Sequence, residues 1–194
     1  MKNKGLWIIL GIVAVVVIWA IAGYNGLVTK SEKALEAWSN VETVYQRRSD
    51  HIPNLVNTVK GYAAHETETL QAVTDARAKS TSMTIDPSTA TPEQMEAWMA
   101  AQQEVGGAIG RLIAIAENYP DLKANQNFME LQKQLEGTEN RISTERRKYN
   151  EAVRKYNVAT RRFPTNILAG IFGFEKMEMF EAAEGAEVAP VVEF

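Results

Sequence analysis

The sequence predicts an all-α protein, in which an N-terminal transmembrane helix precedes an antiparallel, coiled-coil-like bundle of three or four helices. Three observations support this class: an apolar run near the N-terminus, apolar residues at alternating spacings of three and four in three later segments, and polar connections between those segments. The expected divisions are an anchor at 1–23, a helical bundle at 24–164 and an apolar tail at 165–194.

The anchor is predicted from the run Leu6 to Ala22, in which every residue is apolar or glycine. Its length is near the lower limit of the ~17–25 residues that cross a ~30 Å hydrocarbon core as a helix. Trp7 stands at one end and Trp19 and Tyr24 at the other, where aromatic rings favour the membrane interface. We therefore expect a single pass through the inner (plasma) membrane.

The charges beside the run bear on its orientation. Lys2 and Lys4 precede it without an acidic residue, and Lys30 and Lys33 follow it. This count favours a cytoplasmic N-terminus and a domain on the periplasmic side. A cleaved signal peptide is the main alternative, because Ala20-Ile21-Ala22 has the small-x-small form that signal peptidase reads. The length of the apolar run favours the anchor.

The first bundle helix is expected at about 24–80. Its apolar stripe consists of Ala34, Trp38, Val41, Tyr45, Ile52, Leu55, Val59, Tyr62 and Val73. Arg48 and Glu66 occupy two further positions of the stripe. Pro53 removes a backbone donor, but the stripe keeps its phase across it, so a kink is expected rather than a break.

The second helix is expected at 92–118, after a polar connection at 80–91. Thr91 is a suitable N-cap and Gln94 stands three residues later, which together form a capping box ahead of an apolar stripe. Three glycines, at positions 106, 107 and 110, lie inside this helix. They indicate either close approach of another backbone or plain tolerance.

The third helix is expected at 123–163, ending before Pro164. Tyr149-Asn150 and Tyr156-Asn157 repeat at a spacing of seven, which places both tyrosines on the buried stripe and both asparagines beside it. A ladder of asparagine contacts fits this pattern. Two core tyrosines with surface amides fit it equally and are the commoner arrangement.

The expected helix lengths do not match. At ~1.5 Å per residue the first helix would be about 85 Å long and the second about 40 Å, so the second would reach back only to Pro53. The stripe from Ala34 through Trp38 and Val41 to Tyr45 would then lie uncovered near the membrane. A sharp break at Pro53, the C-terminal tail or another copy of the chain could cover it. We favour another copy, and thus a homo-oligomer.

The segment NILAGIFGF is the second expected contact surface. It is strongly apolar and interrupted by glycines, which is typical of a protein contact or of a segment that skims the membrane. Its candidate residues are Ile167, Leu168, Ile171, Phe172 and Phe174. The closing Val191 to Phe194 is expected to dock on the same bundle, although it could also add as a strand to a partner.

The polar cluster around Arg47, Arg48, Asp50 and Pro53 is the third candidate contact. Arginine binds carboxylates and lipid phosphates in bidentate fashion, which suggests a docking site. In the structural alternative, Arg48 pairs with a carboxylate across the bundle and Asp50 accepts from amides freed near the proline.

Several kinds of function are not expected. A net charge of −3 offers no basic field for nucleic acid, and the absence of cysteine excludes disulfides and thiolate chemistry. His51 and His65 are fourteen positions apart on one expected helix, about 21 Å, and thus too far to share a metal ion. No phosphate-binding loop or nucleophile elbow is recognisable. We therefore expect no enzyme, no cofactor and no metal.

Long strings of the sequence resemble the LemA family. They include YNGLV from Tyr24, AWSNVETVYQRRSDHIPNLV from Ala37, YPDLKANQNFMELQKQLEGTENRI from Tyr119, RRKYNEAVRKYN from Arg146 and FPTNILAGIFGF from Phe163. The resemblance implies a single-pass bacterial envelope protein with a helical bundle and no established activity. It also suggests a membrane zinc protease of the HtpX type as a neighbour. The leading hypothesis is a scaffolding protein that self-associates in the lipid bilayer of the cell envelope, and the alternative is an adaptor of such a protease.

Overall fold

The protein is helical throughout the part described by the computed structural model, residues 3–181, and no strand occurs in this range. The helices are α1 (Asn3–Lys60), α2 (Thr67–Ser82), α3 (Pro92–Ala116), α4 (Pro120–Lys123), α5 (Gln126–Arg161) and α6 (Thr165–Phe172). Residues 173–181 follow α6 without regular structure and are called the tail segment below. The all-α class predicted from the sequence is thus confirmed.

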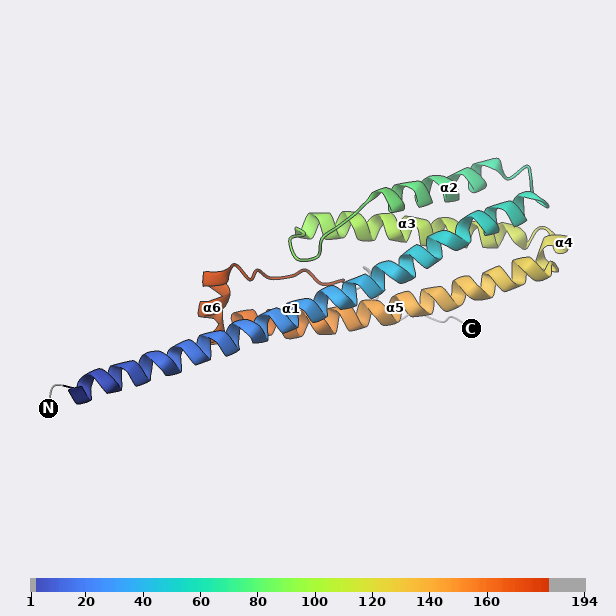
Figure 1. Ribbon diagram of the computed structural model, residues 1–194. Helices are drawn as coiled ribbons and strands as arrows, with labels where there is room; N and C mark the ends of the chain where they lie inside the picture. Colours follow the sequence, from blue (N-terminus) through green and yellow to red (C-terminus); the bar gives the residue numbers. More distant parts are fainter. Residues whose placement is uncertain (1–2, 182–194) are drawn as a thin grey trace, which may run out of the picture.

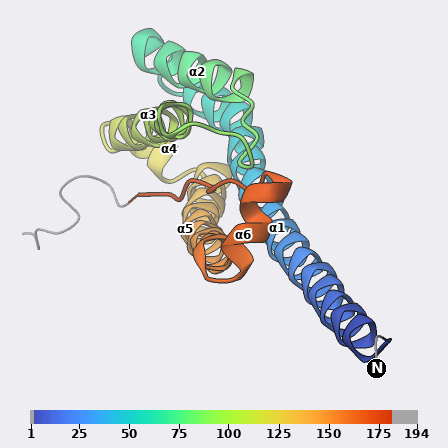
Figure 2. The same ribbon diagram turned by 90° about the vertical axis from the view of Figure 1, so that its left-hand side faces the viewer.

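The long helices lie side by side with alternating direction (Figure 1). α1 packs mainly against α5, while α2 packs against α3 and also against α1. α6 contacts both α1 and α5, and it runs across α1 rather than along it (Figure 1). The N-terminal part of α1 projects well beyond the other elements (Figures 1 and 2).

This projecting part of α1 is long and apolar enough to cross a membrane. None of its most apolar stretch is buried by the rest of the chain. α1 continues without interruption from the apolar run into the helical domain. A rigid helical connection therefore joins the two parts, since no loop separates them.

The expected helix at 24–80 proves to be two helices. α1 ends at Lys60, the chain reverses over residues 61–66, and α2 returns along α1. Ala63 is buried in this turn, and Glu66 accepts a hydrogen bond from the hydroxyl of Tyr119 at 3.0 Å. The apolar stripe hid the turn, because its spacing is the same in one long helix and in two helices that fold against each other.

Pro53 lies inside α1, which continues through it. A proline at this position cannot donate to the carbonyl four residues earlier, which is that of Ser49. Arg77 of α2 donates its Nε–H to this carbonyl at 3.0 Å. The side chain of Asp50 instead accepts from Gln46 at 2.8 Å, so the expectation that Asp50 accepts from amides near the proline is wrong.

α3 begins as its sequence predicts. The amide of Gln94 donates to the Thr91 hydroxyl at 3.3 Å, and the Thr91 amide donates to the Gln94 side chain at 3.0 Å. A Cβ atom at Gly107 or Gly110 would meet nothing within 4 Å, and one at Gly106 would meet only the Arg48 side chain. Within the described residues no other backbone approaches these glycines closely.

The stripe near the membrane is covered by the chain itself. Ala34, Trp38, Val41 and Tyr45 are all buried, which contradicts the expected exposed seam. The residues that cover them come from α3, α5 and the tail segment: Met95, Trp98, Ile142, Tyr149, Val153, Tyr156, Met177 and Phe180. The error arose from helix length, because ending α1 at Lys60 rather than at position 80 lets α3 reach about 30 Å further back along it.

Candidate membrane-proximal site

α6 lies against the segment of α1 where the apolar run ends. Leu168 and Ala169 of α6 are buried together with Leu27 of α1, and Trp19 and Ala20 pack against the same cluster. A Cβ atom at Gly23 would stand 2.5 Å from Cδ1 of Leu168, so the missing side chain allows the close approach of α6. α6 is therefore placed at the level of Trp19 to Leu27.

The outer side of α6 is apolar and exposed. Ile171 is 70% exposed and Phe163, just before the helix, is 76% exposed, while Ile167 and Phe172 are about half exposed. Tyr24 makes edge contacts with the rings of Phe172 at 4.9 Å and Phe174 at 5.7 Å. In the described chain outside the apolar run, these four residues are among the exposed large apolar side chains. We call Phe163, Ile167, Ile171 and Phe172 the α6 apolar surface.

The end of α6 is defined by Gly173. This residue has φ of +71°, in the left-handed region that glycine adopts at little cost, and it caps the helix. The chain can then turn back along α5 as the tail segment (Figures 1 and 2). The position of α6 is thus held from both sides, by its packing on α1 and by the anchored tail.

Two Tyr-Asn pairs of α5 anchor the tail segment. Asn157 donates to the carbonyl of Met177 at 2.8 Å and accepts from its amide at 3.0 Å. Asn150 makes the same pair of hydrogen bonds to the backbone of Phe180, both at 2.8 Å. The hydroxyls of Tyr149 and Tyr156 donate to the carbonyls of Glu178 and Glu175 at 2.9 and 2.8 Å. The seven-residue repeat is therefore an asparagine ladder, and the commoner arrangement with surface amides is wrong.

Burial of these tyrosines changes their ionisation. Loss of hydration raises the pKa of Tyr149 above its ordinary value, and the negative charge of Glu178 adds to this effect. The same two causes, with Glu175 as the charge, raise the pKa of Tyr156. Both hydroxyls thus keep their protons near neutral pH and act as hydrogen-bond donors to the tail segment.

The side chain of Phe180 closes the core beside the tail segment. Its ring stacks on Trp38 with 5.7 Å between centroids and an interplanar angle of 14°. The guanidinium of Arg146 lies over the Phe180 ring at 4.8 Å. Because Trp38 and Tyr45 are buried in this cluster, these two candidate contact residues are core residues.

Arg48 is also a core residue and is only 3% exposed. It donates to Glu139 of α5 at 3.1 Å, and to the carbonyl and side chain of Gln102 of α3 at 2.9 and 2.8 Å. Its guanidinium lies over the ring of Tyr45 at 4.9 Å. This is the structural arrangement considered for the polar cluster. Arg47, Asp50 and Pro53 remain exposed on α1.

The predicted site residues are therefore separated. Ile167, Leu168, Ile171, Phe172 and Phe174 lie together near the apolar run, whereas Arg47 and Asp50 lie further along α1. Sequence reasoning missed Phe163 and Gly23 as parts of the first group. The spacing of Gly23 from Trp19 and Leu27, one helical turn each way, was the available signal. Val191 to Phe194 lie outside the described residues.

The described residues hold no group of three or more His, Asp or Glu side chains that could share a metal ion. His51 is half-buried on α1, whereas His65 is exposed in the turn at 61–66. The geometry instead defines a class of protein: a helical domain joined rigidly to one candidate membrane span, with a second apolar surface at the level where that span ends.

The family assignment agrees with this class. The model of the LemA family matches residues 37–194, and the chain belongs to this family. It is similar to the magnetosome proteins MamQ 1 and MamQ 2 of Paramagnetospirillum magneticum, with 30% identity over 175 residues. This match covers 81% of the chain and 64% of each relative, so the chain spans slightly less than two thirds of their length. Protein LemA of Metamycoplasma hominis is 24% identical over 160 residues, covering 82% of the chain and 69% of that protein.

Proposed function

We propose that the protein is a non-catalytic structural protein of the bacterial envelope, which holds its helical domain at the membrane by two attachments. The first is the apolar run of α1, which crosses the bilayer. The second is the α6 apolar surface, which lies in the membrane interface. The observation that carries the proposal is the exposure of Ile171 and Phe163 at the level where the run ends.

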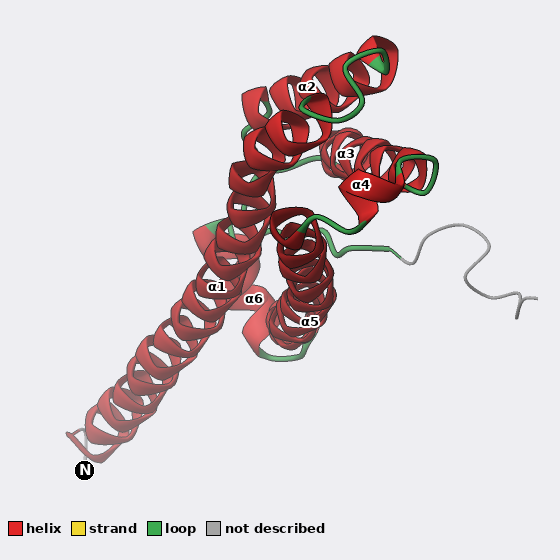
Figure 3. Ribbon diagram, turned by 90° about the vertical axis from the view of Figure 1, so that its right-hand side faces the viewer, coloured by secondary structure: helices red, strands yellow, loops and turns green. Residues whose placement is uncertain are grey.

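The geometry of α6 supports an interfacial position. α6 runs across α1 (Figure 1), and a helix that crosses a membrane-spanning helix lies roughly in the plane of the bilayer. Figure 3 shows α6 beside both α1 and α5, which it contacts. Interfacial helices bury their apolar side chains ~5–10 Å into the boundary between headgroups and acyl chains. Trp19 and Tyr24, which flank the contact with α6, are residue types that favour the same layer.

A spin-label experiment tests this position, since the chain has no native cysteine. A label at Ile171→Cys in the full-length protein, reconstituted in lipid bilayers, should be relaxed by oxygen, which concentrates in the membrane. A label at Met129→Cys serves as the control and should be relaxed by a water-soluble nickel complex. Met129 is an apolar residue on the distal part of α5 and is 49% exposed. Equal access of both labels to the nickel complex would disprove the second attachment.

We further propose that anchored copies self-associate to form a scaffold. Confinement to one membrane raises the effective concentration of the domains, so that weak lateral contacts suffice. The buried stripe of α1 is not the contact surface, because the chain covers it. Energy transfer between copies labelled at Met129→Cys should rise above the value expected for random mixing in the bilayer. Transfer at the random value over a range of protein densities would refute self-association.

The sidedness of the domain is part of the proposal. We place it outside the cytoplasm, following the charges that flank the apolar run. A membrane-impermeant thiol reagent should then label Met129→Cys in intact spheroplasts. In the protease-adaptor alternative, the cluster from Arg47 to Asn54 would be the contact. Arg48 is buried and paired with Glu139, so its guanidinium is not available to a partner.

A further inference from the structure

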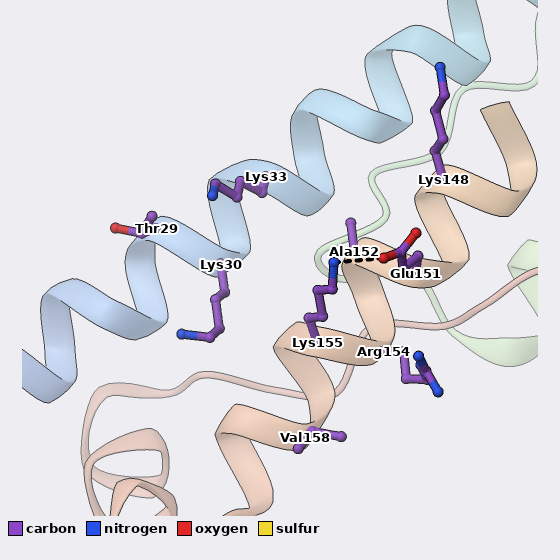
Figure 4. A pocket seen from close by; sticks show the side chains of 9 residues that line it. All are labelled: Thr29, Lys30, Lys33, Lys148, Glu151, Ala152, Arg154, Lys155 and Val158. Atoms are coloured by element: carbon purple, nitrogen blue, oxygen red, sulfur yellow. Dashed lines mark hydrogen bonds and ion pairs between the residues drawn. The ribbon is translucent and has the colours of Figure 1, made fainter.

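A groove between α1 and α5 gathers positive charge next to the proposed membrane surface (Figure 4). Its volume is about 580 Å³, and its ionisable lining residues are Lys30, Lys33, Lys148, Glu151, Arg154 and Lys155. Five cations line the groove with one carboxylate, and because Lys148 pairs with Glu145 outside the lining at 2.8 Å, the local excess is three positive charges in a chain whose net charge is −3. The groove is therefore a local basic site on an acidic protein.

Part of this charge has no protein partner. Lys155 pairs with Glu151 at 2.7 Å, and this hydrogen bond lowers the pKa of Glu151, which keeps it ionised. Among the described residues, no carboxylate lies within 4.0 Å of the charged groups of Lys30, Lys33 or Arg154. The ammonium of Lys30 makes one long contact, 3.4 Å to the carbonyl of Gly26. These three side chains are available to an anion.

The basic surface continues around the end of α5. A second groove of about 410 Å³ on this helix is lined by Arg154, Arg161, Arg162 and Lys176, with no acidic residue in its lining. Val158 lines both grooves and is exposed. The charge excess is therefore a property of this end of the domain.

The groove begins just beyond the headgroup layer. Lys30 and Lys33, which line the groove, are eight and eleven residues beyond Ala22, or about 12 and 16.5 Å along the helix axis. Headgroups extend ~5–7.5 Å beyond the hydrocarbon core on each side. The backbone of Lys30 therefore stands about 4.5 Å beyond this layer, and long lysine side chains can reach back towards the interface. The phosphate of a lipid is the anion that a membrane presents nearest to these lysine side chains.

We propose that the groove between α1 and α5 binds the phosphate of an anionic lipid headgroup, with Lys30 and Lys33 as the principal ligands on α1. Lysine offers a mobile point charge and arginine a bidentate donor pair, and phosphate oxygens accept from both. Val158 and the stem of Lys155 provide apolar contact for the adjoining glycerol. The inference rests on the proposed membrane position of the domain.

Native mass spectrometry of the full-length protein in detergent micelles tests the site. Phosphatidylglycerol and phosphatidylcholine are titrated separately, and the binding constant of the first lipid is measured. The wild type should prefer phosphatidylglycerol. Lys30→Gln with Lys33→Gln should weaken phosphatidylglycerol binding by about fivefold per lysine and leave phosphatidylcholine binding unchanged. The double variant Lys60→Gln with Lys133→Gln is the distal control. It removes the same charge from the distal part of the domain and should preserve the preference for phosphatidylglycerol.

Three results would overturn the inference. The first is a phosphatidylglycerol preference that survives loss of Lys30 and Lys33, and the second is an equal loss in the distal control. The third is inorganic phosphate binding as tightly as phosphatidylglycerol in the same titration, which would assign the groove to a soluble phosphate compound. Circular dichroism verifies that each variant is folded. A wild type that shows no lipid preference while its Ile171→Cys label is lipid-accessible would refute the groove alone. A wild type that shows the preference while this label is not lipid-accessible would refute only the proposed position of α6.

Discussion

Asn157→Ala should release the tail segment from α5. The substitution removes two hydrogen bonds, the donation to the Met177 carbonyl and the acceptance from the Met177 amide. Each hydrogen bond contributes a net ~0.5–1.5 kcal/mol, so the free energy that holds the tail segment on α5 should fall by about 1–3 kcal/mol. Hydrogen exchange through local opening of the segment should then accelerate by about fivefold to 150-fold.

The amide of Phe180 is the best reporter of this opening. It keeps its own acceptor, Asn150, in the Asn157→Ala variant, so faster exchange there measures cooperative release of the segment. Exchange can be followed by NMR on the full-length protein in detergent. Asn140→Ala, an exposed asparagine on the same helix, is the matched control. Unchanged exchange at Phe180, or equal acceleration in the control, would show that the asparagine ladder does not hold the tail segment.

Three further predictions concern the core, the pH dependence and α6. Arg48→Ala should lower the free energy of unfolding by about 2–4 kcal/mol, because it removes charged hydrogen bonds to α3 and α5, and an unchanged thermal midpoint by circular dichroism would contradict this. Because the pKa of Tyr149 is raised in the folded protein, the stabilising contribution of its protonated hydroxyl is complete below the pKa of ~10 in the unfolded chain and is lost as pH rises above that value. Tyr149→Phe should therefore flatten the alkaline decline of the thermal midpoint. Gly23→Val should displace Leu168 and increase the mobility of a spin label on α6, whereas the same substitution at Gly107, which faces open space, should leave that label unchanged.

Much of the local structure could be predicted from the sequence. The capping box of Thr91 and Gln94 and the uninterrupted passage of α1 through Pro53 depend on residues within one or two turns of each other. The apolar character of α6 could likewise be predicted from the run NILAGIFGF. The carbonyl freed by Pro53 could not be matched to Arg77, because nothing local indicates that α2 returns to this position.

Two predictions were wrong for one reason: the length of the first helix and the exposure of the stripe near the membrane. The stripe from Val59 towards Val73 keeps its spacing through the turn at 61–66, so one helix was expected where there are two. A helix of that length leaves Trp38 and its neighbours without a cover, so the sequence favours a second copy of the chain to bury them. In the structure, α3, α5 and the tail segment perform that burial.

The sequence alone determined the helical class, the apolar run and the family, because composition, short-range spacing and matching strings carry these properties. Only the tertiary structure decided where the chain reverses, which residues cover the stripe and what the Tyr-Asn repeat holds. These depend on surfaces that lie far apart along the chain, and their burial against one another has no short-range signature. The same packing brings Lys30 and Lys33 of α1 opposite the last turns of α5, which places a basic groove beside the proposed membrane surface of an acidic protein.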